Sequence, residues 1–379
     1  MWSPRDTSLP EKLDKNKIIV LEKINSLSKD QTEQEIPSAP LNWICLFNLE
    51  NAHQKAIRSV CFEPTKGDIF ASASFDGGTG IWAKNSSGEY ECCTSLEGHE
   101  NEVKSVNWSP SGQLVATCGR DKTIWIWEAA YFGNFEYDCT SVMMEHTQDV
   151  KMILWHPFEE ILASASYDDT IRIWKEDDDD WSCVSILKGH SSTVWAIDFD
   201  PTGTFLASCS DDLTVKIWTP KANFDSVSKT EPHFTADNSE EWRCVLTIPP
   251  EFQSRSIYSI SWSFHYRKPK ILNIEGESIY VDNGYIATVS ADNSICIFSI
   301  CSKLKNVGNI SIDPSSEPFL DNLYRFEIEN MEYKLVSKVE NAHGYFDINS
   351  VRWNNTPGYE NWLVTAGDDN NAKVWYFDL

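Results

Sequence analysis

The chain has 379 residues, of which 41% are hydrophobic and 12% aromatic, so it can bury a large core. Its 57 acidic against 32 basic residues leave a formal net charge of −25, which repels nucleic-acid backbones and anionic lipid. No segment approaches the ~18 uninterrupted apolar residues of a membrane helix, and residues 1–17 lack the apolar core of a secretory signal. We therefore expect a globular protein of the cytosol or nucleus, with no nucleic acid and no membrane among its partners.

The first 40 residues do not share the pattern of the remaining chain. They contain no His, and no Asp turn or Trp stands in the register that later residues follow. "KIIVL" at 17–21 and "LNWICLFNL" at 41–49 predict strands. We expect residues 1–40 to be poorly structured or to form a partial first unit, and residues 41–379 to form the folded domain.

From residue 53 onward, one phrase recurs six times. Each copy has an Asp placed six residues before an aromatic residue and four residues after a Ser or Thr. The six Asp residues are Asp76, Asp121, Asp168, Asp212, Asp292 and Asp369. A His precedes the Asp in five copies, and the fifth copy has none. Stretches of period two, such as "VKSVNWSPSGQLVAT", lie between them, so each unit predicts strand, turn, strand, Asp turn, strand and a fourth strand such as "YECCTSL".

This pattern resembles the WD40 family, whose period is about 40–45 residues. That period matches the consecutive spacings from His53 to His99, from His99 to His146 and from His146 to His190. The resemblance implies an all-β propeller. A four-stranded sheet cannot bury both faces alone, so four-stranded units of this kind are expected to stack radially.

The repeated polar residues have a structural role in the family pattern. There, the His, the Ser or Thr, the Asp and the Trp of one copy form a hydrogen-bonded chain that lets a partly buried Asp keep its charge. Copies that supply all four residues include the second, third and fourth: His99, Thr117, Asp121 and Trp127; His146, Ser164, Asp168 and Trp174; and His190, Ser208, Asp212 and Trp218. A hydrolase triad is excluded because a catalytic site would be unique and this set is repeated. We predict no catalytic residues and no enzyme activity.

Eleven cysteines could suggest disulfides or a metal site, but no Cys-x-x-Cys occurs and only Cys92 and Cys93 are adjacent. We interpret the cysteines as reduced, small core residues. No phosphate-binding loop or zinc motif is present either. We therefore predict no metal and no cofactor.

A closer resemblance is carried by "GHENEVKSV", "HTQDVK" and "SYDDTIRIWKEDDDDW", which exceed what WD40 architecture requires. These motifs resemble the cytosolic iron-sulfur assembly component 1 family, strongly over residues 53–218 and loosely elsewhere. That family is seven-bladed, so the resemblance implies a seven-bladed template with six clear repeats and an incomplete first blade. If 17–21 closes the ring against the last blade, too few residues remain for the three missing strands.

The same resemblance implies a non-catalytic scaffold that delivers clusters to client apoproteins. Family members associate with a small acidic adaptor, a HEAT-repeat scaffold and an iron-only-hydrogenase-like carrier. The alternative is another WD40 scaffold, such as a ubiquitin-ligase substrate receptor or a chromatin reader. An F-box would favour the ligase, and none is visible.

Two positions per blade face the narrow top surface of a propeller: the residue before the turn Asp and the second residue of the innermost strand. We predict a cationic, aromatic partner-binding patch of Arg58, Phe75, Lys104, Arg120, Lys151, Tyr167, Trp195 and Tyr258. Aromatic residues and Arg are enriched at protein interfaces. We expect Arg120 to clamp a carboxylate of an acidic, aromatic-bearing segment. An ordinary solvated rim, with Arg120 paired to Glu102, is the alternative interpretation.

Overall fold

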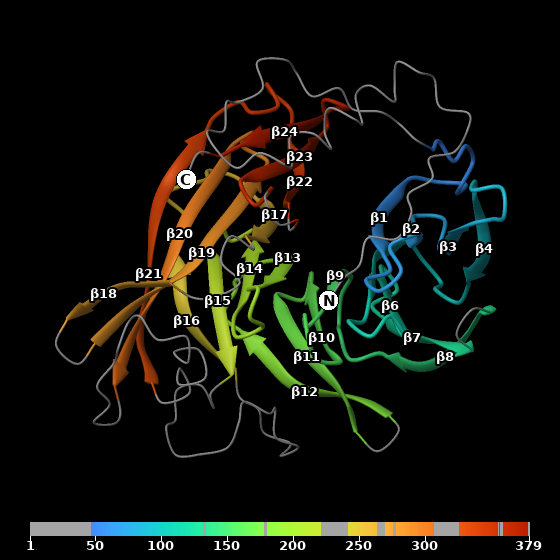
Figure 1. Ribbon diagram of the computed structural model, residues 1–379, viewed down its shortest axis with the longest axis horizontal. Helices are drawn as coiled ribbons and strands as arrows, with labels where there is room; N and C mark the ends of the chain where they lie inside the picture. Colours follow the sequence, from blue (N-terminus) through green and yellow to red (C-terminus); the bar gives the residue numbers. More distant parts are fainter. Residues whose placement is uncertain are drawn as a thin grey trace, which may run out of the picture.

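The computed structural model describes residues 47–131, 134–177, 180–220, 242–263, 270–275, 278–306, 326–354, 356 and 359–377. Within these ranges the secondary structure consists of 24 strands and connecting turns, with no helix. Figure 1 shows the strands as six sheets that follow one another in chain order around an arc. The predictions for residues 1–40 and for the strand at 17–21 fall outside the described residues.

The six sheets are called blades A to F. Blade A contains β1 (Ile57–Phe62), β2 (Ile69–Ser74), β3 (Thr79–Lys84) and β4 (Tyr90–Leu96). Blade B contains β5 (Val103–Trp108), β6 (Leu114–Gly119), β7 (Ile124–Tyr131) and β8 (Asn134–Met143). Blade C contains β9 (Val150–Trp155), β10 (Ile161–Ser166), β11 (Thr170–Asp177) and β12 (Asp180–Lys188).

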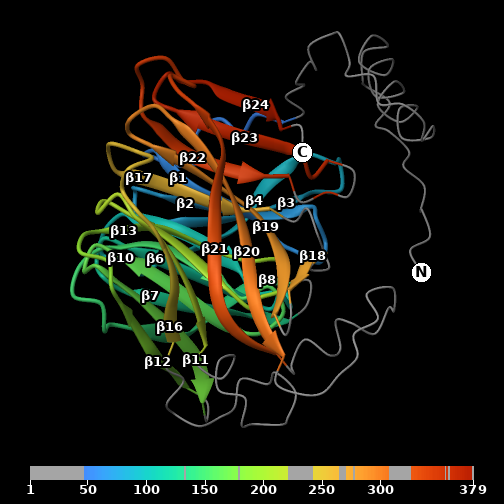
Figure 2. The same cartoon turned by 90° about the vertical axis from the view of Figure 1, so that its left-hand side faces the viewer.

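Blade D contains β13 (Val194–Phe199), β14 (Leu206–Ser210), β15 (Val215–Pro220) and β16 (Trp242–Ile248). Blade E contains β17 (Ile257–Trp262), β19 (Ser278–Ser290), β20 (Ile295–Asn306) and β21 (Phe326–Val339), with β18 (Lys270–Glu275) paired to β19. Figure 2 shows β20 and β21 as the long orange strands of this blade. Blade F has three strands: β22 (Ile348–Trp353), β23 (Trp362–Gly367) and β24 (Ala372–Tyr376).

The predicted all-β propeller with six clear repeats is confirmed, because each of the six Asp copies lies in its own antiparallel sheet. The Asp turn itself explains why the phrase recurs. In every copy an Asp oxygen accepts a hydrogen bond from the backbone N–H two residues later, for example Thr170 to Asp168 at 3.1 Å. The residue directly after the Asp has positive φ in all six turns: Gly77, Lys122, Asp169, Leu213, Asn293 and Asn370.

Adjacent blades pack through their innermost strands. Between blades A and B, Val103, Val106 and Trp108 of β5 lie in one buried cluster with Ala71 of β2 and Ile81 of β3. Each fully buried aliphatic or aromatic side chain of this kind contributes about 1.5–3 kcal/mol. The first, fourth and sixth residues of an inner strand therefore hold one blade to the preceding one.

The cysteine prediction is wrong in part. All ten described cysteines are free, and Cys118, Cys209 and Cys296 are buried as expected. Cys92 and Cys139 are exposed instead. Both lie on the fourth strand of a blade, opposite the motif Trp and beside a β-bulge, where the strand faces outward.

Candidate partner-binding face

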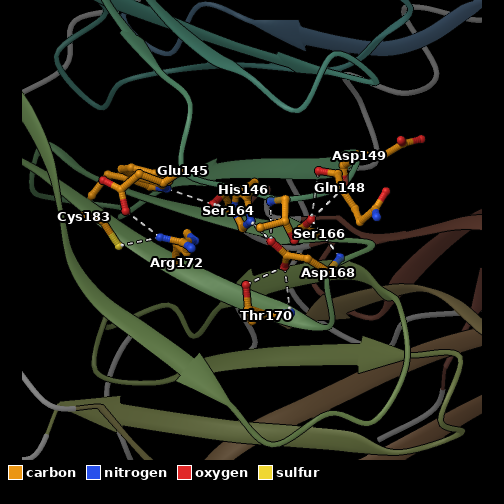
Figure 3. Close-up of polar contacts among 12 residues, drawn as sticks. Glu145, His146, Gln148, Asp149, Ser164, Ser166, Asp168, Thr170, Arg172 and Cys183 are labelled. Atoms are coloured by element: carbon orange, nitrogen blue, oxygen red, sulfur yellow. Dashed lines mark hydrogen bonds and ion pairs between the residues drawn. The ribbon is translucent and has the colours of Figure 1, made fainter.

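The polar residues of blade C form one hydrogen-bonded chain, shown in Figure 3. His146 Nδ1 lies 2.8 Å from Asp168, and its Nε2 lies 2.7 Å from the hydroxyl of Ser164. Trp174 Nε1 donates to the same hydroxyl at 2.8 Å. Because a carboxylate only accepts, Nδ1 donates to it, and Ser164, which accepts from Trp174, has its own proton to offer Nε2.

The same chain recurs in four other blades. It joins His99, Thr117, Asp121 and Trp127 in blade B; His190, Ser208, Asp212 and Trp218 in blade D; His53, Ser72, Asp76 and Trp82 in blade A; and His343, Thr365, Asp369 and Trp375 in blade F. Blade E differs, because Gln253 takes the place of the His and accepts from Thr288 at 2.8 Å.

This chain fixes the charge of the turn Asp. Burial raises the pKa of Asp168, but hydrogen bonds from His146 and Thr170 outweigh it, and the net pKa lies well below the ordinary value. The hydroxyls are inaccessible, since Ser164 and Ser208 have no exposed surface. The set therefore locks each blade rather than presenting a nucleophile to a substrate.

Lys104 and Phe75 come from different blades and meet across their boundary. The Lys104 ammonium lies 4.5 Å from the centre of the Phe75 ring, and 2.6 Å from Glu102. The hydrogen bond from Lys104, partly opposed by burial, lowers the pKa of Glu102. Lys104 is thus an oriented cation stacked on an aromatic ring.

Lys151 makes the corresponding contact farther along the arc. Its ammonium lies 5.0 Å from the ring centres of both Tyr167 and Trp195, and 3.3 Å from Asp149. Burial lowers the pKa of Lys151, and Asp149 opposes that shift. The Trp195 ring meets Tyr258 of blade E edge to face at 5.1 Å. A continuous row of aromatic rings and one cation therefore joins blades C, D and E.

The two arginines are less constrained than the two lysines. Arg120 has a side chain 55% exposed, and it reaches Glu102 at 3.4 Å. Arg58 is exposed and, among the described residues, has no ion-pair partner. Desolvation by the surrounding protein lowers the pKa of Arg58. Both guanidinium groups therefore have N–H donors left to offer a partner.

Blades E and F complete the surface with a different character. Ala291, which precedes the turn Asp of blade E, is buried, and its carbonyl accepts from Arg255 at 2.7 Å. Arg255 also lies 3.4 Å from Asp347. Asn349 donates to Asp368 at 2.5 Å. The patch cations thus lie on blades A to C, and the aromatic rings of the patch end at Tyr258 of blade E.

Two residues of this face, Asp149 and Arg255, escaped the sequence prediction, and Glu102 was expected only as a partner of Arg120. Glu102 and Asp149 stand two residues before the patch lysines and orient them, and Arg255 stands two residues before the inner strand of blade E. A charged residue just before an inner strand is a signal that could have found all three. Among the described residues, no group of His, Cys, Asp and Glu could hold a metal ion. No helix in those ranges could cross a membrane.

Comparisons with known proteins agree on a family. Residues 90–128, 137–175, 181–219 and 334–376 match the family model described as WD domain, G-beta repeat. The chain is 37% identical over 345 residues to a protein of Vanderwaltozyma polyspora named probable cytosolic iron-sulfur protein assembly protein 1, covering 87% of this chain and 83% of that protein. Proteins of the same name from Kluyveromyces lactis and Candida glabrata are each 38% identical, covering 87% and 86% of this chain and 84% and 83% of their own lengths.

Proposed function

Because the chain belongs to the family of cytosolic iron-sulfur protein assembly protein 1, built on WD40 repeats, we propose that it is a non-catalytic scaffold for that assembly. It acts in the cytosol and holds client apoproteins and assembly factors together so that clusters can be delivered. Its proposed partners are a small acidic adaptor, a HEAT-repeat scaffold and a hydrogenase-like carrier. It needs no cofactor of its own for this role.

The observation that carries the proposal is the predicted cationic, aromatic patch, whose cations lie on blades A to C and whose aromatic rings extend to Tyr258 of blade E. On a chain of net charge −25, a surface that gathers Arg58, Lys104, Arg120 and Lys151 attracts acidic segments against the overall field. Aromatic rings beside these cations supply apolar contact area with little loss of side-chain entropy. This combination fits an acidic peptide that also carries an aromatic side chain.

The four cations have different tasks in this proposal. Lys104 and Lys151 are held by acidic neighbours and by stacked rings, so they shape the surface and set its potential. Arg120 is half exposed and only loosely held by Glu102, so it can exchange that contact for a carboxylate of the partner. A planar guanidinium binds a carboxylate with two parallel hydrogen bonds, and Arg120 is proposed to clamp a chain terminus in this way.

The test is the charge reversal Arg120→Glu in the full chain. Because Arg120 is exposed and weakly paired, the melting temperature should change little. Client capture should weaken by the roughly 2 kcal/mol expected of an interface hot spot, about thirtyfold in affinity. The matched control is Lys188→Glu, which makes the same charge change at an exposed position on the outer strand β12.

Affinity purification followed by mass spectrometry reads out both the partners and the effect. Recovery of iron-sulfur assembly factors with the natural chain, and their loss with Arg120→Glu but not with Lys188→Glu, supports the proposal. Equal recovery with both variants at physiological salt would place the partners on the blade sides or on the opposite face. Recovery of ubiquitin-ligase or chromatin subunits in their place would favour the other class of scaffold.

A further inference from the structure

The loop that leads into the inner strand of blade F carries two exposed aromatic side chains. Tyr345 is 92% exposed and Phe346 is 52% exposed. The corresponding loops of the five other blades contain no aromatic residue; they are 54–56, 100–102, 147–149, 191–193 and 254–256. Residues 343–347 are called the blade F loop. Because Tyr345 is almost wholly exposed, its ring adds little to the packing of its own blade.

One additional residue gives the blade F loop its shape. The inner strand begins four positions after the His or Gln in blades A to E, but five positions after His343 in blade F. In blades A to E the next N–H donates to the turn Asp. The N–H of Gly344 donates instead to the carbonyl of Asn341 at 2.9 Å, and that of Phe346 donates to His343 at 3.4 Å. Gly344 has φ 69°, which glycine adopts freely. This tight turn holds Tyr345 outward.

Three carboxylates gather beside the loop, around the ring of Tyr258 in blade E. They are called the acidic trio: Asp211 of blade D and Asp347 and Asp368 of blade F. Burial raises the pKa of Tyr258, and all three carboxylates raise it further. Asp347 directly follows Phe346, and the N–H of Asp368 donates to the carbonyl of Asp347 at 2.9 Å. The exposed rings and the acidic trio therefore form one continuous surface.

The acidic trio keeps most of its negative charge. Asp368 accepts from the Asn349 amide at 2.5 Å, and Asp211 accepts from the Trp195 indole at 2.6 Å. Within the described ranges neither of these carboxylates makes an ion pair. Neutral donors orient a carboxylate without cancelling its charge, so this part of the top face attracts cations.

We propose that the blade F loop and the acidic trio form a second docking surface, which binds a basic, Arg-containing segment of a protein partner. A guanidinium stacks on aromatic faces and pairs with carboxylates. Tyr345 and Phe346 supply the rings, and Asp347 and Asp368 supply the carboxylates. Charge complementarity favours this occupant, because an acidic segment would be repelled.

This surface goes beyond the proposed function, because its charge is opposite to that of the cationic, aromatic patch. The patch cations lie on blades A to C, whereas the exposed rings of the blade F loop and two of the three carboxylates lie on blade F. The top face thus offers separate surfaces to an acidic and to a basic segment. The second surface does not depend on whether Arg120 binds a client.

The test measures the binding of a dye-labelled peptide of alternating Gly and Arg to the full chain, by fluorescence anisotropy at physiological salt. The double change Tyr345→Ser with Phe346→Ser removes the rings, and Asp368→Lys reverses one charge. Each should weaken binding by about fivefold or more. Phe158→Ser, at a side chain 67% exposed, and Asp138→Lys, at an exposed position on β8, are the matched controls and should leave the affinity unchanged.

The variants should keep the natural melting temperature, since the altered side chains are exposed. Arg120→Glu should bind the basic peptide at least as well as the natural chain does, which separates this proposal from the clamping of a client carboxylate. Failure of the natural chain to bind the peptide would overturn the proposal. So would equal weakening by Asp368→Lys and Asp138→Lys, because net charge alone would then attract the peptide. Unchanged binding without the two rings, or a dimer mass that Tyr345→Ser abolishes, would overturn it too.

Discussion

Blades D and E are neighbours with the same inner-strand plan, yet they hold their Asp turns with different side chains. In blade D, His190 links Asp212 to Ser208, and Trp218 completes the chain. In blade E, Gln253 accepts from Thr288 and donates to Ser294, and Asp292 is held by Ser254 and Ser294 without any His. The turn therefore requires the Asp and the left-handed residue after it, while the group behind it need only satisfy the buried hydroxyl.

The largest effect tests what the two blades share. Burial raises the pKa of Asp212, but hydrogen bonds from His190 and Thr214 outweigh this effect and lower the pKa. The pKa of Asp292 is also lowered, because hydrogen bonds from Ser294 and Ser254 outweigh its burial. A carboxyl whose folded pKa lies below its unfolded value of about 3.9 stabilises the fold fully above that pH. This stabilisation is lost as pH falls through the folded pKa. We expect cooperative unfolding as the pH falls from 4 toward 2, and circular dichroism measures this transition.

The control for this acid transition is Asp212→Asn, which removes one titrating group. It should be less stable at neutral pH, because Asn is a poorer acceptor for the Ser191 and Thr214 N–H groups. Its stability should also fall less steeply between pH 5 and pH 3. Identical slopes for the variant and the natural chain would show that Asp212 does not drive the acid transition.

The repeated phrase made blades A to D and F predictable, because its spacing is set by local geometry. An Asp that accepts from the N–H two residues later, and a Trp that reaches back to a Ser or Thr, work at fixed sequence separations. The patch positions could also be read from that register, and Lys104 with Phe75 and Lys151 with Tyr167 do meet.

What the sequence did not predict depends on contacts without a fixed spacing. Gln253 stands far upstream of Asp292 because an insertion lengthens blade E, so the His register points to no residue there. The pairing of Lys104 with Glu102 and the burial of Ala291 follow from how side chains fill the top face. The exposure of Val60 could not be predicted, since its strand has the same apolar pattern as the five buried ones.

A smaller effect tests the exchange of His for Gln. His190→Ala removes one hydrogen-bond partner of Asp212 and one of Ser208, and should cost about 1–3 kcal/mol of unfolding free energy. His190→Gln should recover part of this cost, because Gln can both donate to the carboxylate and accept from the hydroxyl, as Gln253 accepts in blade E. Urea denaturation compares the two variants.

Gln253→Ala is the matched change in blade E, and it should cost about 1 kcal/mol, because Thr288 loses a partner while Asp292 keeps its hydrogen bonds from Ser254 and Ser294. If His190→Gln proves as damaging as His190→Ala, the two blades do not share one solution. The His would then be required by its aromatic ring, which lies 6.3 Å from Trp218, and not by its hydrogen bonds.

The smallest effect concerns the residue after the turn Asp, which is Leu213 in blade D and Asn293 in blade E. Both have positive φ, 65° and 66°. The left-handed conformation costs an ordinary residue roughly 1–2 kcal/mol, whereas Asn tolerates it and Gly adopts it freely. Blade A uses Gly77 at the same position with φ 93°. Leu213→Gly should therefore stabilise the protein by about 0.5 kcal/mol, after the added entropy of Gly in the unfolded chain is subtracted. Asn293→Gly should change the unfolding free energy less. If Leu213→Gly instead destabilises the protein in thermal and urea melts, the Leu213 side chain contributes packing that outweighs its backbone strain.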